Sequence, residues 1–403
     1  MLTHLAAVGG LAAGLLGAGG PAVTVHSIRS AEQAQLGEIG VPAAWPLTRG
    51  RGVTVAVLDT GVDASVPDLA GSVTAGPDEV PGADPPGYQP PYQHGTYIAS
   101  LIAGHGSGAG DRSGIIGIAP AARILSVRVI LDDSEPGFAQ FANAPANDAV
   151  GNGIRYAVQH GASVINMSLG SISPTEDLRA ALAYAAAHGV VMVAAAGNDG
   201  AAAPGYTPFS YPAAFPGVIA VAAVSPDGDR AAFSDENASV VLSAPGVDVF
   251  GAGPGGSYVE ADGTSPASAE VAGVAALIRS RYPRLTPFQV ERALVSSTSH
   301  RPRGGYSPGT GFGEVNALAA LAAAGRLAAA SAQPGLAAGA SFTHPGPIEV
   351  VHRDGVRIAG YTAAAVVLVL AFLALMVLTA ERIRRLRRLR DPPPGSEQLA
   401  EPQ

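Results

Sequence analysis

The sequence contains no cysteine and no lysine, and only one tryptophan among its 403 residues. The absence of cysteine excludes disulfide frameworks, thiolate zinc sites and a cysteine nucleophile. All 24 basic residues are arginines, and with 32 acidic residues they give a net charge of −8. This balance provides no overall cationic field, so a nucleic-acid-binding role is excluded.

Glycine and proline together make up about a fifth of the chain, and hydrophobic residues make up 47%. Disordered low-complexity chains typically reach roughly 25–30% glycine and proline, so global disorder and a collagen-like rod are excluded. The length of 403 residues predicts roughly two to three domains and allows a sizeable core.

A long uncharged run covers residues 358–380, and six arginines follow it between Arg382 and Arg390. A run of 23 residues at about 1.5 Å of rise per residue spans the roughly 30 Å hydrocarbon core of a bilayer, and it is too long and too apolar for an ordinary buried helix. The positive-inside rule then places the tail 381–403 in the cytoplasm and everything before residue 358 outside. We therefore expect a single-pass protein of the cell membrane with an extracytoplasmic folded part.

The first 28 residues contain no Arg, Asp or Glu, and the apolar stretch Leu2–Leu16 is typical of a signal peptide. We expect this signal to cover residues 1–23. A positively charged leading region is missing, so an uncleaved anchor or a different start position are the alternatives. Residues 24–48 then form an N-terminal extension.

The folded domain is predicted over residues 49–321, and the Ala-, Gly- and Pro-rich residues 322–357 are predicted to be a tether to the membrane helix. Within the folded domain, continuously apolar strand-like runs alternate with helical patterns, which indicates a mostly parallel sheet buried on both faces by helices. The predicted strands are 53–58, 124–129, 163–168, 190–195 and 217–224. Two irregular segments, 80–93 and 131–148, are predicted to be surface loops beside a cleft.

Four polar residues stand where strands end or helices begin. Asp59 ends the first strand, His94 opens a helix, Asn198 follows a strand, and Ser265 opens a helix of small residues. In open α/β sheets, ligands bind beyond the carboxyl ends of the strands, so these residues are expected to converge. Taken singly, each has an ordinary explanation: a cap, a surface histidine, or the turn that Asn-Asp-Gly favours.

The combination is more specific, because the chain order Asp, His, Ser is that of subtilisin-type triads. The motifs LDTGVD at Asp59, HGT and IAS from His94, AAGN ending at Asn198, and GTS with VAG around Ser265 resemble the signature blocks of the subtilisin-like serine proteases, or subtilases. The resemblance covers about residues 50–320. It implies an α/β subtilisin-like fold with a mostly parallel buried sheet flanked by helices, and serine endopeptidase activity.

The resemblance also implies the residues of the site. Ser265 would be the nucleophile, His94 the base, and Asp59 the residue that orients the imidazole, while the Asn198 amide would donate to the oxyanion. Two segments would pair with an extended substrate backbone: Ser168, Leu169 and Gly170, and Ala195, Ala196 and Gly197. No cofactor and no metal ligand is predicted, since the other eight histidines show no metal-ligand spacing; the resemblance leaves a structural calcium ion open.

The chain departs from the common subtilase pattern at four positions. Ala269 stands where Pro is common four residues after the nucleophile, and Pro266 follows Ser265 directly, where the first helical turn tolerates it. Glu270 and Gln93 also replace more usual residues. These changes bear on specificity and rate more than on mechanism.

Within the subtilases, the extension AEQAQLGEIGVPAAWPLTRGRG, the tether, the single C-terminal helix and the basic tail look like the mycosins, the membrane-anchored proteases of actinobacterial type VII secretion systems. That resemblance implies protein or peptide substrates and membrane components of the secretion system as partners. A mainly structural role in a secretion complex, and a general cell-surface subtilase, are the two alternatives.

Overall fold

The structure is a computed structural model, and it describes residues 25–108, 110, 113–142, 148–202, 205–332, 376 and 378–382. The chain forms two compact units, Met1–Gln333 and Pro334–Gln403, and all elements described below belong to the first. The predicted signal peptide 1–23 and most of the predicted membrane span 358–380 lie outside the described residues. Among the residues that are described, no helix is long and apolar enough to cross a bilayer.

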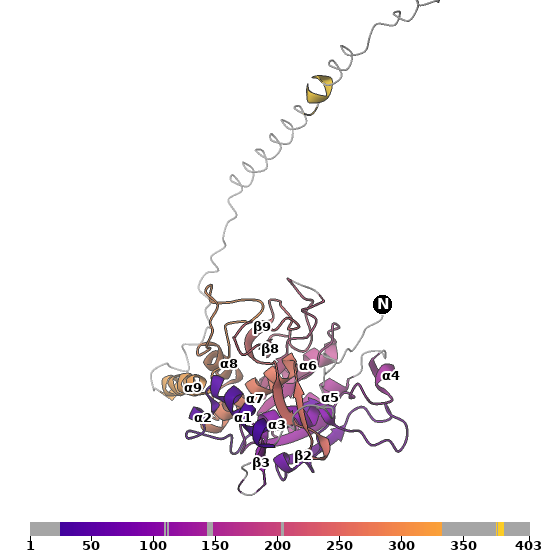
Figure 1. Cartoon of the computed structure of the whole chain (residues 1–403), viewed down its shortest axis with the longest axis vertical. Coiled ribbons are helices and arrows are strands. Elements are labelled where there is room, and N and C mark those ends of the chain that lie inside the picture. Colours follow the sequence, from indigo (N-terminus) through magenta and orange to yellow (C-terminus); the bar gives the residue numbers. More distant parts are fainter. Residues whose placement is uncertain are drawn as a thin grey trace, which may run out of the picture. The chain divides into compact units, whose positions relative to one another are not determined.

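A seven-stranded sheet with the order β2-β5-β1-β6-β7-β8-β9 organises the domain (Figure 1). Every pairing in it is parallel. Its strands are β1 (Thr54–Asp59), β2 (Val73–Asp78), β5 (Arg123–Arg128), β6 (Val164–Met167), β7 (Val191–Ala195), β8 (Val218–Val224) and β9 (Val240–Pro245). The α/β class and the five predicted strands are therefore confirmed.

Helices cover both faces of the sheet. Successive side chains of each strand point to opposite faces, so each strand contributes to two buried clusters. Val55 and Val57 of β1 join one buried cluster with α3 (Gln93–Ala103) and α7 (Thr264–Arg281). Ala56 and Leu58 join a second cluster with α5 (Ala149–Gln159) and α6 (Glu176–Ala187). Apolar residues occupy consecutive positions of β1 for this reason, as expected for a parallel sheet between helical layers.

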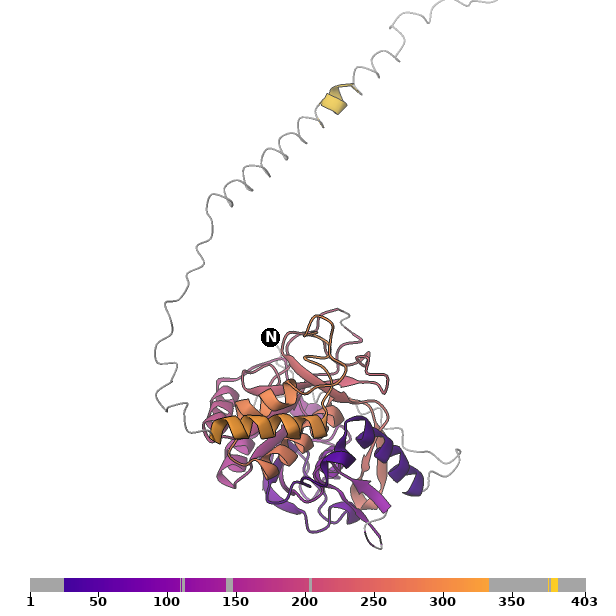
Figure 2. The same cartoon turned by 90° about the vertical axis from the view of Figure 1, so that its left-hand side faces the viewer.

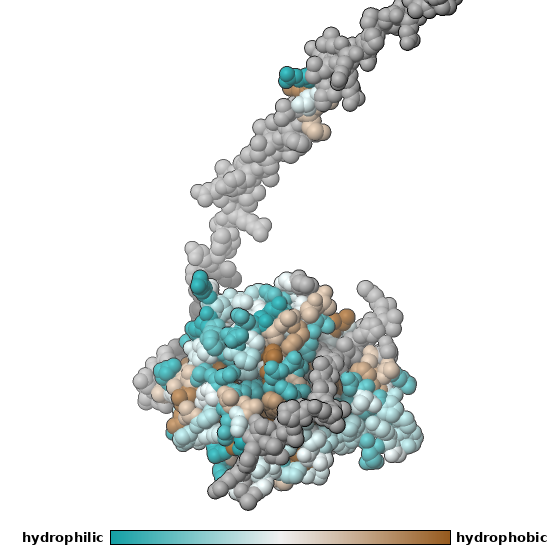
Figure 3. All heavy atoms as spheres, in the orientation of Figure 1, coloured by the Kyte–Doolittle hydropathy of each residue, from teal (hydrophilic) through white to brown (hydrophobic). Residues whose placement is uncertain are grey.

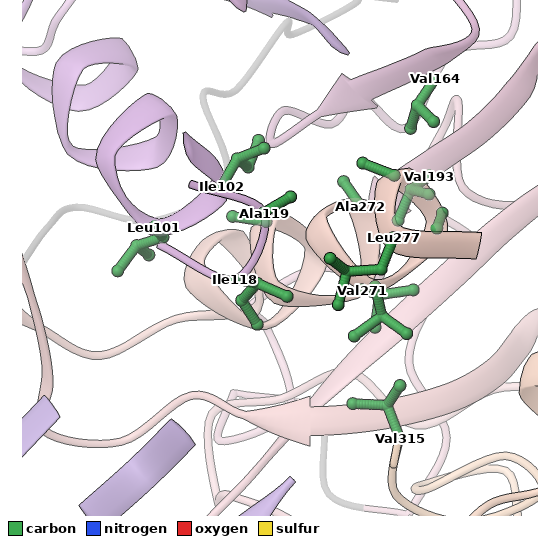
Figure 4. Close-up of a cluster of buried hydrophobic side chains, with 14 of the residues drawn as sticks. Leu101, Ile102, Ile118, Ala119, Val164, Val193, Val271, Ala272, Leu277 and Val315 are labelled. Carbon is green, nitrogen blue, oxygen red and sulfur yellow. The ribbon is translucent and has the colours of Figure 1, made fainter. Parts of the chain in front are cut away.

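Helix α7 lies at the centre of the first layer and is buried from Thr264 through Arg279. Its small residues let neighbours approach closely: a Cβ at Gly273 would lie 2.6 Å from the side chain of Ile118. Figure 4 shows Val271 and Leu277 of α7 in one cluster with Ile102 of α3 and Val193 of β7. This packing fixes the N-terminal end of α7, where Ser265 lies.

Further helices extend the first layer (Figure 2). The N-terminal extension forms α1 (Val25–Glu38) and α2 (Val41–Ala44), with Ile28, Leu36 and Ile39 buried. Helix α9 (Ala317–Ala332) packs on α7 and on α8 (Pro287–Val295). It crosses residue 321, the predicted end of the folded domain, with Ala323 and Ala324 buried. The remaining elements are η1 (Pro67–Leu69), β3 (His105–Ser107), β4 (Ser113–Ile116), α4 (Phe138–Ala142), β10 (Val249–Ala252), η2 (Pro254–Gly256) and β11 (Tyr258–Ala261).

One prediction about the loops holds only in part, since the described residues of the segment 131–148 are a mixture of exposed and buried ones. The segment 131–148 was expected to be a surface loop, but Leu131, Asp132 and Glu135 are buried, and α4 interrupts the segment. Glu135 is buried because its carboxylate forms an ion pair with the buried guanidinium of Arg128. On the face of the molecule drawn in Figure 3, hydrophobic residues are interspersed among hydrophilic ones.

Candidate active site

Asp59 and His94 form a buried hydrogen-bonded pair at the carboxyl end of β1, an inner strand of the sheet that lies between β5 and β6. The Nδ1 atom of His94 lies 2.7 Å from Oδ1 of Asp59, and the backbone N–H of Thr60 donates to the same oxygen at 2.7 Å. The Asp59 side chain is fully buried and that of His94 is 12% exposed. Since the carboxylate accepts at Nδ1, the proton of a neutral imidazole lies there, and Nε2 is the basic nitrogen.

The charge around His94 favours its protonated form. Burial of the ring lowers the pKa of His94, but the charge and hydrogen bond of Asp59, together with the charges of Asp132 and Asp133, outweigh burial and raise this pKa above the usual 6.5. An imidazolium formed during a reaction is therefore stabilised in place.

Close approach of α3 to the loop after β1 explains the glycine that follows His94. A Cβ at Gly95 would lie 2.0 Å from the carbonyl oxygen of Gly61. The N–H of Gly95 also donates to Oγ1 of Thr60 at 3.0 Å. Any side chain at position 95 would push the helix away from the strand that carries Asp59.

Ser265 lies in the first turn of α7, as the sequence predicted, and is 4% exposed. Its carbonyl oxygen accepts from Oγ of Ser168 at 3.1 Å and from Oγ of Ser268 at 2.9 Å. Its own hydroxyl donates to the Ser168 carbonyl at 3.5 Å, and among the described residues no hydrogen bond joins it to His94. Such bonds are often long or unformed until substrate is bound.

Asn198, in the loop after β7, is tied to the residue before the serine. Its Oδ1 accepts from the N–H of Thr264 at 3.0 Å and from Oγ1 of Thr264 at 2.9 Å. The Thr264 hydroxyl in turn accepts from the N–H of Gly197 at 3.2 Å. The two bonds at Oδ1 fix the plane of the amide, so Nδ2 is its donor group beside the start of α7.

The positive φ in this loop belongs to Gly197, at +121°, and not to Asn198. A Cβ at Gly197 would also lie 2.1 Å from Oδ2 of Asp235. Asp235 accepts from the N–H of Asp199 at 2.8 Å, and burial raises its pKa to about 6. The backbone conformation therefore explains the glycine but gives no reason for asparagine at 198, which removes the ordinary turn explanation.

The two predicted substrate segments follow neighbouring parallel strands. Ser168, Leu169 and Gly170 come directly after β6, while Ala195, Ala196 and Gly197 end or follow β7, and all six are buried. Ala196 and Gly197 already make backbone hydrogen bonds to Val221 and Asp235. In the described part of the chain, Leu169 and Gly170 make no backbone hydrogen bond.

Three residues that hold the predicted site residues in place were not identified from the sequence. Asp132 accepts from the N–H groups of Gln93 and His94, while Thr264 and Asp235 hold the Asn198 loop. Asp132 could have been found, because it lies in the loop after β5, at the edge of the sheet where Asp59 ends β1. Thr264 stands in the GTS motif, but no local pattern reveals its role or that of Asp235, because their partners come from distant loops.

Acidic side chains do gather nearby, but the described residues contain no group of three or more His, Asp or Glu arranged to hold a metal ion. Asp78, Asp84 and Glu135 surround the guanidinium of Arg128 at 2.8, 2.7 and 2.6 Å. These carboxylates thus bind an arginine, and they do not fit a calcium site.

Comparison with known proteins agrees with this geometry. The chain is 38% identical to thermitase of Thermoactinomyces vulgaris over 286 residues, which cover 70% of this chain and 94% of thermitase. It is 37% identical to subtilisin E of Bacillus subtilis (strain 168) over 271 residues, 67% of this chain and 66% of that protein. The crystal structure of fervidolysin from Fervidobacterium pennivorans, a keratinolytic enzyme related to subtilisin, matches 72% of this chain and 45% of its own length, with a TM-score of 0.62 and 33% identity.

The sequence profile of the Subtilase family matches residues 50–313, about two thirds of the chain. This range includes Asp59, His94, Asn198 and Ser265. The chain therefore belongs to the subtilase family of serine endopeptidases.

Proposed function

We propose that this protein is an extracytoplasmic serine endopeptidase that cleaves protein or peptide substrates with Asp59, His94 and Ser265. The observation that carries the proposal is the buried Asp59–His94 pair, whose Nδ1–Oδ1 distance is 2.7 Å. It leaves Nε2 as the proton acceptor, and the helix α3 that carries His94 packs on α7, whose first turn carries the buried Ser265.

In the first half of the reaction, Oγ of Ser265 attacks the scissile carbonyl while Nε2 of His94 takes the hydroxyl proton. The hydroxyl donates to the Ser168 carbonyl at 3.5 Å in the structure, and it leaves this contact when it turns to Nε2. Collapse of the tetrahedral intermediate breaks the C–N bond, and the imidazolium gives its proton to the leaving amine. Asp59 stabilises the imidazolium but keeps its own negative charge.

In the second half, a water molecule gives a proton to Nε2 and attacks the acyl-enzyme carbonyl. Collapse of the second intermediate returns the proton to Oγ of Ser265 and releases the new carboxylate. The negative oxygen of both intermediates is stabilised by Nδ2 of Asn198 and by the backbone N–H of Ser265. The positive end of the α7 dipole acts at the same point.

An extended substrate backbone would lie along the segment after β6. Leu169 and Gly170 make no backbone hydrogen bond within the described chain, so their N–H and C=O groups can pair with the substrate as an added strand. Such pairing recognises the main chain and holds the scissile bond in a fixed register at Ser265.

The activity is tested by incubating the purified full-length chain with internally quenched peptides. We expect cleavage by the wild type and its loss in Ser265→Ala and His94→Ala variants of the same melting temperature. Cleavage that survives Ser265→Ala in the purified protein would refute the proposal.

We further propose that the protein is a single-pass protein of the cell membrane, with the catalytic domain outside and the C-terminus in the cytoplasm. The support is the uncharged run 358–380 and the six arginines that follow it. A reporter fused after Gln403 should report cytoplasm, and one inserted near Gly335 should report the outer face. The reverse pattern would refute the orientation.

For the cellular role, we propose association with a type VII secretion system. The support is the resemblance to the mycosins in the order of N-terminal extension, protease domain, tether, helix and basic tail. Co-purification of the full chain with membrane components of that secretion system is the expected result. Secretion restored by Ser265→Ala in a deletion strain would favour a mainly structural role, and co-purification without those components would favour a general cell-surface protease.

A further inference from the structure

The helix that carries His94 is capped by a carboxylate from another part of the chain. Helix α3 begins after Tyr92, whose side chain makes no cap hydrogen bond. Instead, Oδ2 of Asp132 accepts from the N–H of Gln93 at 2.9 Å, and Oδ1 accepts from the N–H of His94 at 3.0 Å. One carboxylate thus satisfies two N–H groups that a helix start leaves without a partner.

Asp132 is itself held in place. Its backbone N–H donates to Oε1 of Glu135 at 2.7 Å, and Oε2 of Glu135 lies 2.6 Å from the guanidinium of Arg128. Arg128 ends strand β5, which pairs with the strand of Asp59 in register, Asp59 beside Arg128. The sheet therefore positions His94 from two sides: directly through Asp59, and through Arg128, Glu135 and Asp132.

The charged groups that face His94 come from two elements. Asp59 comes from β1, and Asp132 and Asp133 come from the segment after β5; all three carboxylates raise the pKa of His94 against the effect of burial. Asp132 is 6% exposed and touches the backbone of His94, whereas Asp133 is exposed and makes no hydrogen bond among the described residues. Asp132 and Asp133 therefore differ in burial and in hydrogen bonding but carry the same charge.

We propose that Asp132 is a positioning residue for the subtilase triad, which holds the catalytic histidine at the start of α3 and supplies a second negative charge beside its ring. This inference rests on the proposed function, in which His94 is the base. It assigns Asp132 no contact with the substrate. The residue acts through the backbone and the electrostatic environment of His94.

The test compares Asp132→Asn with Asp133→Asn. Asp133 carries the same charge but makes no hydrogen bond to α3, so its variant is the control for the loss of one negative charge. Histidine-ring signals of the full-length chain are titrated by NMR in a Ser265→Ala background, with His94→Ala identifying the signal. We expect Asp132→Asn to lower the pKa of His94 by more than Asp133→Asn does, because the nearer and more buried charge is lost. This measurement needs no activity, so it decides the role of Asp132 even if peptide cleavage by the wild type fails and the proposed function with it.

Kinetics of the active full-length chain give the second readout. At a pH where His94 is neutral in all variants, Asp132→Ala should lower kcat by up to about 10²-fold with KM little changed, because the base is misplaced while the substrate strand is not. Asp133→Ala should keep kcat within about twofold. An equal effect of the two asparagine variants on the pKa of His94, or a wild-type kcat in folded Asp132→Ala, would overturn the proposal.

Discussion

Removing the amide of Asn198 should slow the chemical step without weakening substrate binding, because this donor is needed where the oxyanion forms. For Asn198→Ala we expect kcat to fall by about 10²–10³-fold, equivalent to about 2.7–4 kcal/mol, the cost known for an oxyanion-hole donor in subtilisin and carried over here to a relative. The KM should stay nearly unchanged. Asn198→Gly should be as damaging, since Gly197 and not Asn198 has the positive φ that glycine would relieve.

The hydrogen bonds around Thr264 set the size of a second, smaller effect. Thr264→Val removes both hydrogen bonds of the hydroxyl, the one it donates to Oδ1 of Asn198 and the one it accepts from the N–H of Gly197, but keeps the backbone bond to Oδ1 at 3.0 Å. Only the bond to Oδ1 orients the amide of Asn198, and one hydrogen bond is worth about 0.5–1.5 kcal/mol, so kcat should fall by about two- to tenfold. If Thr264 acts through Asn198, its effect should vanish in the Asn198→Ala background.

Steady-state kinetics with one quenched peptide decide both points, with melting temperatures as the control for folding. A Thr264→Val loss that is the same in both backgrounds would refute the coupling of the two residues. Full activity of Asn198→Gly would remove Asn198 from the site and return its loop to an ordinary turn.

Three further predictions concern pH and packing. Since the pKa of His94 is raised above 6.5 and the base must be neutral, kcat/KM should fall on acidification with a midpoint above that value; a midpoint below it in a pH–rate profile would contradict the charge balance around the ring. Gly95→Ala should destabilise the fold by about 1–3 kcal/mol in denaturant titrations and lower kcat, because its Cβ would meet the Gly61 carbonyl, whereas Gly37→Ala, with nothing within 4 Å of the new Cβ, should cost little stability. Burial and the charges of Glu314 and Glu38 raise the pKa of Glu270 well above 4.5. The folded state therefore loses stability as the pH rises above 4.5, because the unfolded chain ionises Glu270 more easily. Glu270→Gln should then raise Tm more at pH 8 than at pH 5, and an equal change at the two pH values would refute the raised pKa of Glu270.

Local sequence patterns were sufficient for much of the sheet and for the elements that carry the three proposed triad residues. Buried parallel strands such as 53–58 read as continuous apolar runs, and Asp59, His94 and Ser265 stand at strand or helix ends that such runs define. Strand β2 was missed because VTAGPD is a partly exposed edge strand that includes Gly76 and Pro77. Its place in the sheet depends on pairing with β5, which no local pattern expresses.

The supporting residues were harder to predict, because their roles depend on contacts between distant segments. Asp132 was assigned to a surface loop, since a run of Asp, Ser, Glu and Pro usually is one. Its burial requires Arg128, and its function as a cap requires a helix that begins 39 residues earlier. Thr264 likewise gains its role only when the loop after β7 meets the start of α7.

The central claim is that Ser265 is a nucleophile activated by His94, and covalent labelling of the full-length protein tests it most directly. After reaction with a fluorophosphonate, peptide mapping by mass spectrometry should find one adduct, on Ser265, that is absent in Ser265→Ala and forms far more slowly in His94→Ala. Folded wild-type protein that gains no adduct on Ser265, or that is labelled equally fast without His94, would contradict the account.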